Sequence, residues 1–189
     1  MAMVNFRNAK YILSAPSYEY RPKDGLKEVV FVGKSNVGKS TLINALTAQK
    51  LAYSSKNAGK TRYLNYFLID NAFYLVDSPG YGFTKYGSKE DENFGEMMEN
   101  YFHNPSLKGC LFLIDSRREP SEDDRMLLDH LSSLNVPTLI VLTKSDLAKQ
   151  SEIAKAKKIF AGLDVILASK ETKPDLLRQR IVNFIKDKK

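Results

Sequence analysis

Short segments of almost continuous apolar residues recur along the chain. They occupy residues 28–33, 73–77, 108–115, 137–142 and 164–168 and are rich in Val, Ile, Leu and Phe. Continuous apolarity, in contrast to an alternation of apolar and polar residues, is typical of strands that are covered on both faces of a parallel sheet. The pattern therefore predicts five buried strands.

Helical patterns follow several of these strands. Ser121 precedes three acidic residues and a stripe of leucines, so a helix is predicted to begin there. Residues 152–161 form another helical pattern, which Gly162 would end in the left-handed conformation. Pro174 and Asp175 begin the last predicted helix. Its expected inner face consists of Leu177, Ile181, Phe184 and Ile185.

One pair of predicted strands is antiparallel. Residues 61–69 are strand-like, and a short turn at Asp70 and Asn71 leads from them into the next strand. A connection this short joins antiparallel strands, because a parallel crossover needs about a dozen residues or more. Residues 9–15 are a candidate for a further edge strand. The expected fold is a three-layer α/β domain whose sheet is mostly parallel with an antiparallel edge strand.

The composition fits a single globular domain. The chain has 189 residues, of which 43% are apolar, enough for a core and too many for a disordered or collagen-like chain. We expect one domain over residues 1–189, with its core at about 26–187 and an N-terminal extension at 1–25. The net charge of +7 and the pI near 9.3 favour an acidic partner, of which nucleic acid is the commonest.

The cysteine content and the hydropathy argue against a secreted or membrane protein. Cys110 is the one cysteine, which excludes an internal disulfide and a cysteine-based metal cluster; its apolar neighbours predict a buried side chain. No segment approaches the roughly 20 apolar residues that span a bilayer, and the N-terminus lacks a signal-peptide pattern. We therefore expect a cytoplasmic protein without a membrane partner, and a monomer by default.

A phosphate-binding loop follows the first buried strand. Residues 33–40, GKSNVGKS, match the pattern G-x-x-x-x-G-K-[S/T] in full. Between a strand and a helix, the backbone N–H groups of such a loop surround phosphates, Lys39 would reach the β- and γ-phosphates, and Ser40 would coordinate Mg²⁺. An ordinary glycine turn is the alternative, and it would not explain eight matched residues. The predicted nucleotide-binding residues here are Gly33, Lys34, Ser35, Asn36, Val37, Gly38, Lys39, Ser40 and Thr41.

Two further stretches would complete a triphosphate site. Asp77 ends a buried strand in the sequence DSPG, where it could hold a Mg²⁺-bound water while the N–H of Gly80 meets the γ-phosphate. Gly59 and Thr61 belong to AGKT; Thr61 could bind both Mg²⁺ and the γ-phosphate in a switch that the phosphate orders. A threonine that merely starts a strand is the alternative. Lys39, Thr61 and Gly80 are the predicted catalytic residues.

Two loops after later strands would select the base. Asp146, in TKSD, can accept two hydrogen bonds from the ring N–H and the amine of guanine, a pair of donors that adenine lacks, and Lys144 would lie along the base. The alternative role for Asp146 is a helix cap. The backbone N–H of Ser169 could donate to the guanine carbonyl. The predicted base-binding residues are Thr143, Lys144, Asp146, Ala168, Ser169 and Lys170.

The motifs GKSNVGKS, AGKTR, DSPGYGF, TKSD and ASK, in this order, resemble the translation-factor-related GTPases of the Era, EngA and TrmE kind. Residues 59–67 and the sequence DSRREP at 115–120 are similar to the EngB (YsxC/YihA) branch, and the resemblance covers about residues 5–185. It implies a bacterial GTPase that binds GTP and GDP with Mg²⁺. It also implies a role in assembly of the large ribosomal subunit, whose rRNA and ribosomal proteins would be its partners.

Three residues depart from the commonest GTPase pattern or stand out within it. Thr143 stands where the guanine motif usually begins with Asn. Tyr81 stands where many small GTPases have a Gln that orients water, so we expect slow hydrolysis that a partner stimulates. In potassium-activated relatives, an Asn at the position of Asn36 helps to hold K⁺ against the phosphates; alternatively, Asn36 only shapes the loop by bonding its backbone.

The second switch is expected at about residues 79–92. Its tyrosines, phenylalanine and lysines, Tyr81, Phe83, Lys85, Tyr86 and Lys89, would suit an RNA-contacting surface, although mobile loops tolerate such residues without binding anything.

Two other functions compete with the switch. One is an RNA-binding module that uses GTP only as a conformational ligand, and the other is a nucleotide or small-molecule kinase. Asp146 and the lack of an arginine-rich lid argue against the kinase. His103 and His130 have no partner at metal-ligand spacing, so surface or capping roles are expected for them.

Overall fold

The computed structural model describes residues 4–52, 63–82, 89–170 and 172–186. Within them, a seven-stranded sheet has the order β1-β3-β4-β2-β5-β6-β7. Its strands are β1 (Ala9–Ala15), β2 (Lys27–Gly33), β3 (Leu64–Ile69), β4 (Phe73–Asp77), β5 (Leu107–Asp115), β6 (Thr138–Thr143) and β7 (Asp164–Leu167). All pairs from β4 to β7 are parallel, whereas β3 is antiparallel to both β4 and β1. The mostly parallel sheet with its antiparallel edge pairing is confirmed.

The N-terminal segment closes one edge of the sheet. Asp70 and Asn71 both have a φ of 51°, and the N–H of Ala72 donates to the oxygen of Ile69, so a type I′ turn joins β3 to β4. The Asp70 carboxylate then accepts hydrogen bonds from the backbone of Asn5 and from the side chain of Asn8. Strand β1 is thereby held beside β3, which lies one position inside the edge.

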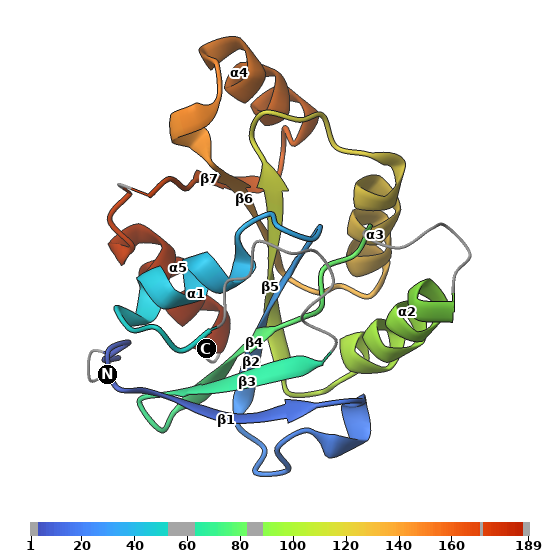
Figure 1. Cartoon of the computed structure of the whole chain (residues 1–189), viewed down its shortest axis with the longest axis vertical. Coiled ribbons are helices and arrows are strands. Elements are labelled where there is room, and N and C mark those ends of the chain that lie inside the picture. The colour runs from blue at the N-terminus through green and yellow to red at the C-terminus, as the bar shows by residue number, and fades with distance from the viewer. Residues whose placement is uncertain (1–3, 53–62, 83–88, 171, 187–189) are drawn as a thin grey trace.

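Helices cover both faces of the sheet (Figure 1). They are α1 (Lys39–Thr47), α2 (Lys89–Phe102), α3 (Glu122–Ser133), α4 (Gln150–Ile159) and α5 (Asp175–Ile185), with short 3₁₀ turns η1 (Tyr18–Tyr20) and η2 (Ser145–Leu147). Helices α1 and α5 pack on the face that carries Val29 and Phe31 of β2. Helices α2, α3 and α4 pack on the face that carries Val30 and Val32, which gives the expected three layers.

The predicted helix signals are confirmed with small shifts of their ends. Ser121 caps α3, with a reciprocal pair of bonds between Ser121 and Asp124. Helix α4 begins two residues before the predicted start, and Gly162 follows it with a φ of 91°. Cys110 is fully buried, as expected. In the part of the chain that the structure describes, no helix is both long and apolar enough to cross a bilayer.

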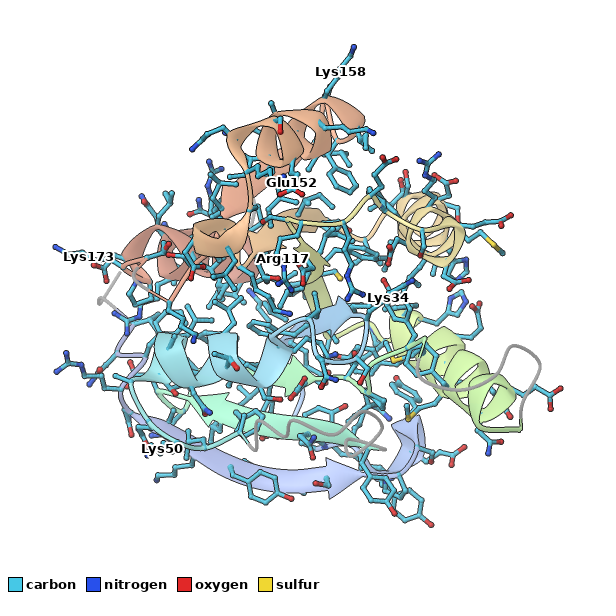
Figure 2. The ribbon with its side chains drawn as sticks, turned by 45° about the horizontal axis from the view of Figure 1, so that its top comes forward. Lys34, Lys50, Arg117, Glu152, Lys158 and Lys173 are labelled. Atoms are coloured by element: carbon cyan, nitrogen blue, oxygen red, sulfur yellow. The ribbon has the colours of Figure 1, made fainter. Side chains whose placement is uncertain are left out.

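Because the core strands are parallel, their carboxyl ends meet at one edge of the sheet, where α/β proteins bind ligands. The loops that begin there are those after β2, β4, β5, β6 and β7, and they carry the predicted motifs. Figure 2 is turned so that this edge comes forward, with Lys34 and Arg117 labelled on the loops after β2 and β5.

Candidate functional site

The phosphate-binding loop joins β2 to α1, the strand–loop–helix context that the motif requires. Gly38 lies directly before α1 with a φ of 112°, and Asn36 has a φ of 61°, so the loop uses left-handed backbone at both positions. A Cβ atom on Gly33 would lie 2.7 Å from the oxygen of Leu113 and 2.9 Å from Val37 Cγ1. Only glycine allows this close packing of the loop against β5.

Lys39, Ser40 and Asp77 meet beneath this loop. Lys39 Nζ donates to the oxygen of Gly33 at 3.0 Å, and Ser40 Oγ donates to Asp77 Oδ2 at 2.7 Å. Asp77 Oδ1 is buried and has no hydrogen-bond partner in the described part of the chain. Burial raises the pKa of Asp77, and the nearby Lys39 charge opposes that rise; burial likewise lowers the pKa of Lys39.

The oxygens of this cluster fit a hard divalent cation. A hydroxyl oxygen and a carboxylate are ligands that Mg²⁺ prefers, usually with several retained waters. The unpartnered Oδ1 of Asp77 is an acceptor that a Mg²⁺-bound water could satisfy. The geometry of Ser40 and Asp77 is therefore compatible with the metal site that the sequence predicts.

The DSPG motif lies directly on the phosphate-binding loop. The N–H of Ser35 donates to the oxygen of Tyr81 at 3.0 Å, within an isolated parallel bridge between Lys34 and Tyr81. A Cβ on Gly80 would lie 2.6 Å from Ser35 Cα, so Gly80 permits the contact. The structure thus brings Gly80 against the loop where a γ-phosphate contact was predicted.

The side chain of Tyr81 points into the protein and not into the site. It is 7% exposed, its ring centroid lies 6.1 Å from that of Phe94, and its hydroxyl donates to Asp124 Oδ1. Burial, and then the charge of Asp124, raises the pKa of Tyr81 far above its usual value. The expectation that Tyr81 offers a stacking face to RNA is therefore wrong for this conformation. Phe83, Lys85 and Tyr86 lie outside the described residues, as do Gly59 and Thr61 of the first switch.

The two predicted base-binding loops are joined to each other. The N–H of Ser145 donates to the oxygen of Ala168 at 3.1 Å, which sets TKSD beside ASK. The Asp146 side chain is exposed. The N–H of Ser169, predicted to face the guanine carbonyl, donates at 3.0 Å to Thr172 Oγ1 in this structure, so the Thr172 hydroxyl closes the turn.

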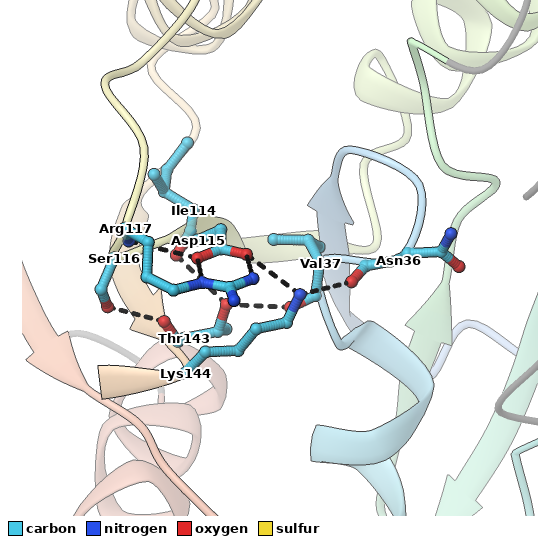
Figure 3. Close-up of polar contacts among 8 residues, drawn as sticks. All are labelled: Asn36, Val37, Ile114, Asp115, Ser116, Arg117, Thr143 and Lys144. Atoms are coloured by element: carbon cyan, nitrogen blue, oxygen red, sulfur yellow. Dashed lines mark hydrogen bonds and ion pairs between the residues drawn. The ribbon is translucent and has the colours of Figure 1, made fainter. Parts of the chain in front are cut away.

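Thr143 and Lys144 connect the base-binding loop to the phosphate-binding loop (Figure 3). Thr143 Oγ1 donates to the oxygen of Val37 at 2.8 Å. Lys144 Nζ donates to the oxygen of Asn36 and to Asp115 Oδ2, both at 3.0 Å. The Thr143 hydroxyl therefore links the two loops.

Asp115 and Arg117 complete this network, and neither was predicted as a site residue. Arg117 Nε donates to Asp115 Oδ1 at 2.9 Å and Nη2 donates to Oδ2 at 2.7 Å. Burial alone would raise the pKa of Asp115, but the bonds from Arg117 and Lys144 hold it well below the usual range. Asp115 is the last residue of β5, at the edge of the sheet where the predicted motifs lie. An acidic residue at the end of a buried apolar segment is the sequence signal that could have identified it.

Known proteins resemble the chain at the level of sequence. A family model described as 50S ribosome-binding GTPase matches residues 28–144. The probable GTP-binding protein EngB of Lactobacillus acidophilus is 45% identical over 159 residues, which cover 83% of this chain and 80% of that protein. The protein of the same name from Clostridium botulinum Alaska E43 is 42% identical over 172 residues, 90% of this chain and 86% of its own.

Solved structures resemble the fold. A variant of Aquifex aeolicus Era bound to GDP and AlF₄⁻ has a TM-score of 0.70 and 25% identity; the match covers 87% of this chain and 58% of that longer chain. A probable GTP-binding protein engB has a TM-score of 0.66 and 24% identity, covering 84% of this chain and 98% of its own.

Proposed function

Since the chain belongs to the EngB family of GTP-binding proteins and carries a GTPase domain, we propose that it is a switch in assembly of the large ribosomal subunit. The observation that best supports a nucleotide switch is the link between two loops at the sheet edge. Thr143 and Lys144 of the base-binding loop donate hydrogen bonds to the phosphate-binding loop. Such a link makes base recognition and phosphate binding parts of one site. The family description, which names 50S ribosome binding, and the net charge of +7 support the ribosomal part of the proposal.

In this proposal, residues 33–41 surround the phosphates of GTP or GDP. Ser40 and, through water, Asp77 would hold Mg²⁺, which would supply positive charge to offset that of the triphosphate. The buried Lys39 would give up its bond to Gly33 and turn to the phosphates. Thr61 and Gly80 would contact the γ-phosphate, and Gly80 is supported by its position on Ser35. Asp146 and Lys144 would bind guanine, and the N–H of Ser169 would exchange its bond to Thr172 Oγ1 for one to the guanine carbonyl.

Hydrolysis would then depend on positioning and charge, because this chain lacks a residue that orients water at the usual place. The Tyr81 hydroxyl is bound to Asp124, so it neither donates to nor accepts from water beside a γ-phosphate. Slow intrinsic turnover follows, with acceleration by the ribosomal partner and by K⁺ held near Asn36.

The guanine assignment can be tested by titrating GTP, GDP, ATP and xanthine nucleotides against the wild type and Asp146→Asn. An asparagine reverses the hydrogen-bond pattern offered to the base, so the variant should lose guanine affinity and gain xanthine affinity. Asp129→Asn, an exposed carboxylate on α3, is the matched control and should change neither. Unchanged affinities in Asp146→Asn would contradict the assignment.

Tyr81 stands in place of a water-orienting Gln and its hydroxyl is bound to Asp124, which also favours a second function, an RNA-binding module that uses GTP only as a conformational ligand. GTP turnover with and without large ribosomal subunits separates the two. A rise of about tenfold or more, a barrier change of about 1.4 kcal/mol, supports the switch. Binding to the subunits without any rise in turnover supports the module.

A further inference from the structure

Charge is distributed unevenly along the chain. Residues 89–134 contain eleven Asp and Glu against five Lys and Arg, whereas residues 144–189 contain twelve Lys and Arg against six Asp and Glu. The first segment includes α2 and α3, and the second includes α4 and α5. The net charge of +7 therefore conceals an acidic part and a strongly basic part.

The two helices that carry most of the acidic side chains pack against each other. Helices α2 and α3 lie side by side (Figure 1), His130 Nε2 of α3 is 2.7 Å from Glu99 Oε2 of α2, and the ring of His130 lies 6.2 Å from that of Phe102. We call the exposed surface of these two helices the acidic face. It is defined by the exposed side chains of Glu92, Glu96, Glu99, Glu122, Asp123 and Asp129. A polyanion would be repelled from it.

The basic part lies at the β7 edge of the sheet, around α4 and the loop that leads into α5. We call it the basic edge and define it by the exposed Lys149, Lys157, Lys158, Lys170 and Lys173. The described part of the chain gives none of these five ammonium groups an ion pair. Figure 2 shows Lys158 and Lys173 projecting outward, away from α2 and α3.

Three carboxylates of this segment are already engaged within the described residues. Asp164 pairs with Arg180 at 2.8 Å, and Asp175 pairs with Arg178 at 3.0 Å. Glu152 Oε2 accepts the N–H of Lys149 at the start of α4. The excess of twelve Lys and Arg over six Asp and Glu in this segment therefore gives this edge a net positive field.

The residue types at the basic edge specify the kind of anion. Its exposed large apolar side chains are aliphatic: Leu147, Ile159, Leu163 and Leu176. Among the described residues, the exposed aromatic side chains Tyr11, Tyr20 and Tyr63 lie near β1 and β3, at the opposite edge. Unpaired bases are recognised by aromatic stacking, whereas duplex RNA is bound through its phosphates without sequence readout.

We propose that the basic edge binds the phosphate backbone of double-helical RNA, with the acidic face turned away from it. This deepens the proposed function, on which it rests for the source of the RNA in the large ribosomal subunit. Lys157 and Lys158 also stabilise α4 because they lie in its last turn. Lys170 and Lys173 lie outside any helix and have no such role.

A matched pair of variants tests the proposal. The double variant Lys158→Gln, Lys173→Gln removes two positive charges from the basic edge. Arg125→Glu, at an exposed position of α3, also lowers the net charge by two units. Binding to salt-washed large ribosomal subunits and to a duplex RNA of about 20 base pairs is measured over a salt series. Loss of two phosphate contacts should reduce the slope of log affinity against log salt by about two, with an affinity loss of about tenfold or more. Arg125→Glu should keep the wild-type slope and affinity.

Each outcome separates this proposal from the proposed function. Equal losses in both variants would show that net charge acts without the basic edge, and equal binding of single-stranded RNA with the same number of phosphates would contradict duplex recognition. If the wild type and the lysine variant bind subunits equally well, the proposal that RNA binds at the basic edge is wrong, while the proposed ribosomal role stands. If the wild type binds duplex RNA through these lysines but binds no subunits, the proposed ribosomal role is wrong, while the proposal that duplex RNA binds at the basic edge is supported. Unchanged GDP affinity confirms that the variants are folded, and the thermal midpoint of the lysine variant should fall only slightly, because Lys158 lies in the last turn of α4.

Discussion

The hydroxyl of Tyr81 donates a hydrogen bond to Oδ1 of Asp124, with 2.5 Å between the two oxygens. The other oxygen of this carboxylate accepts the backbone N–H and the hydroxyl of Ser121, the cap of α3. Asp124 therefore connects Tyr81, the residue after the DSPG motif, to the start of α3. The N–H of Ser35 also donates to the backbone oxygen of Tyr81. Tyr81 therefore links α3 to the phosphate-binding loop.

Replacing Tyr81 by Phe should lower stability and leave hydrolysis nearly unchanged. The substitution leaves buried Asp124 Oδ1 without its donor, which typically costs about 1–3 kcal/mol. For a chain of this size, the thermal midpoint should fall by roughly 2–4 °C for each kcal/mol. The kcat for GTP should stay within about twofold of the wild-type value, since the hydroxyl does not face the site.

Tyr74→Phe is the matched control for this prediction. The Tyr74 hydroxyl donates at 2.7 Å to Asp24, whose carboxylate is exposed and can be solvated after the change. Its effect on the thermal midpoint should be smaller. A fall in kcat of about tenfold for Tyr81→Phe at unchanged stability would contradict the structural role.

Gly80→Ala should disrupt the contact between the DSPG motif and the phosphate-binding loop. The new Cβ would lie 2.6 Å from Ser35 Cα and 2.8 Å from Ser35 N, both backbone atoms that cannot rotate away. We expect a loss of more than about 1 kcal/mol in the free energy of unfolding, together with weaker nucleotide binding. Denaturant unfolding and GDP titration measure the two effects.

Gly95→Ala provides the control with the opposite sign. Gly95 lies within α2, and nothing lies within 4 Å of the position that its Cβ would take. Alanine there should stabilise the protein by up to about 1 kcal/mol. Similar effects of the two substitutions would show that the contact between Gly80 and Ser35 does not constrain the chain.

The sequence predicts the parts of this structure that local chemistry determines. Continuous apolarity identifies the core strands, the glycines of residues 33–38 identify the phosphate-binding loop, and Asp70 with Asn71 predicts the turn between β3 and β4. The burial of Tyr81 could not be predicted, because its partner Asp124 is 43 residues away and reaches it only through the packing of α3. The pairing of Asp115 with Lys144 likewise depends on β5 and β6 being neighbours, which periodicity does not reveal.

Asp115→Asn should lower the free energy of unfolding at neutral pH. The difference from the wild type should disappear in acid. The folded-state pKa of Asp115 lies below the unfolded value of about 3.9. The carboxylate therefore stabilises the folded state above about pH 4, and this contribution is lost as the pH falls further. The difference in unfolding free energy between wild type and variant should be constant from about pH 8 to 5 and should narrow below about pH 4.

The same variant should bind GDP about tenfold more weakly, because a neutral amide replaces the charged carboxylate that accepts from Lys144, and Lys144 then holds the phosphate-binding loop less firmly. Asp129→Asn, which replaces an exposed carboxylate of α3, should show neither effect. A stability difference that grows toward low pH, or unchanged GDP affinity, would show that Asp115 does not act through Lys144.

Asn36 should make GTP hydrolysis faster in K⁺ than in Na⁺ at equal ionic strength. Its side chain is exposed, points away from Asp115 and Lys144 (Figure 3), and has no hydrogen bond in the described part of the chain. The alternative in which Asn36 shapes the loop by bonding its backbone therefore finds no support here. The carboxamide oxygen is available to a monovalent cation beside the phosphates.

Two substitutions distinguish the carboxamide from the backbone at this position. Asn36→Gly keeps the left-handed conformation, with its φ of 61°, and removes the oxygen, so its rates in K⁺ and Na⁺ should be equal. Asn36→Asp keeps an oxygen and should retain the preference for K⁺. Equal wild-type rates in the two salts would exclude potassium activation, and a K⁺ preference that survives in Asn36→Gly would assign the cation to other ligands.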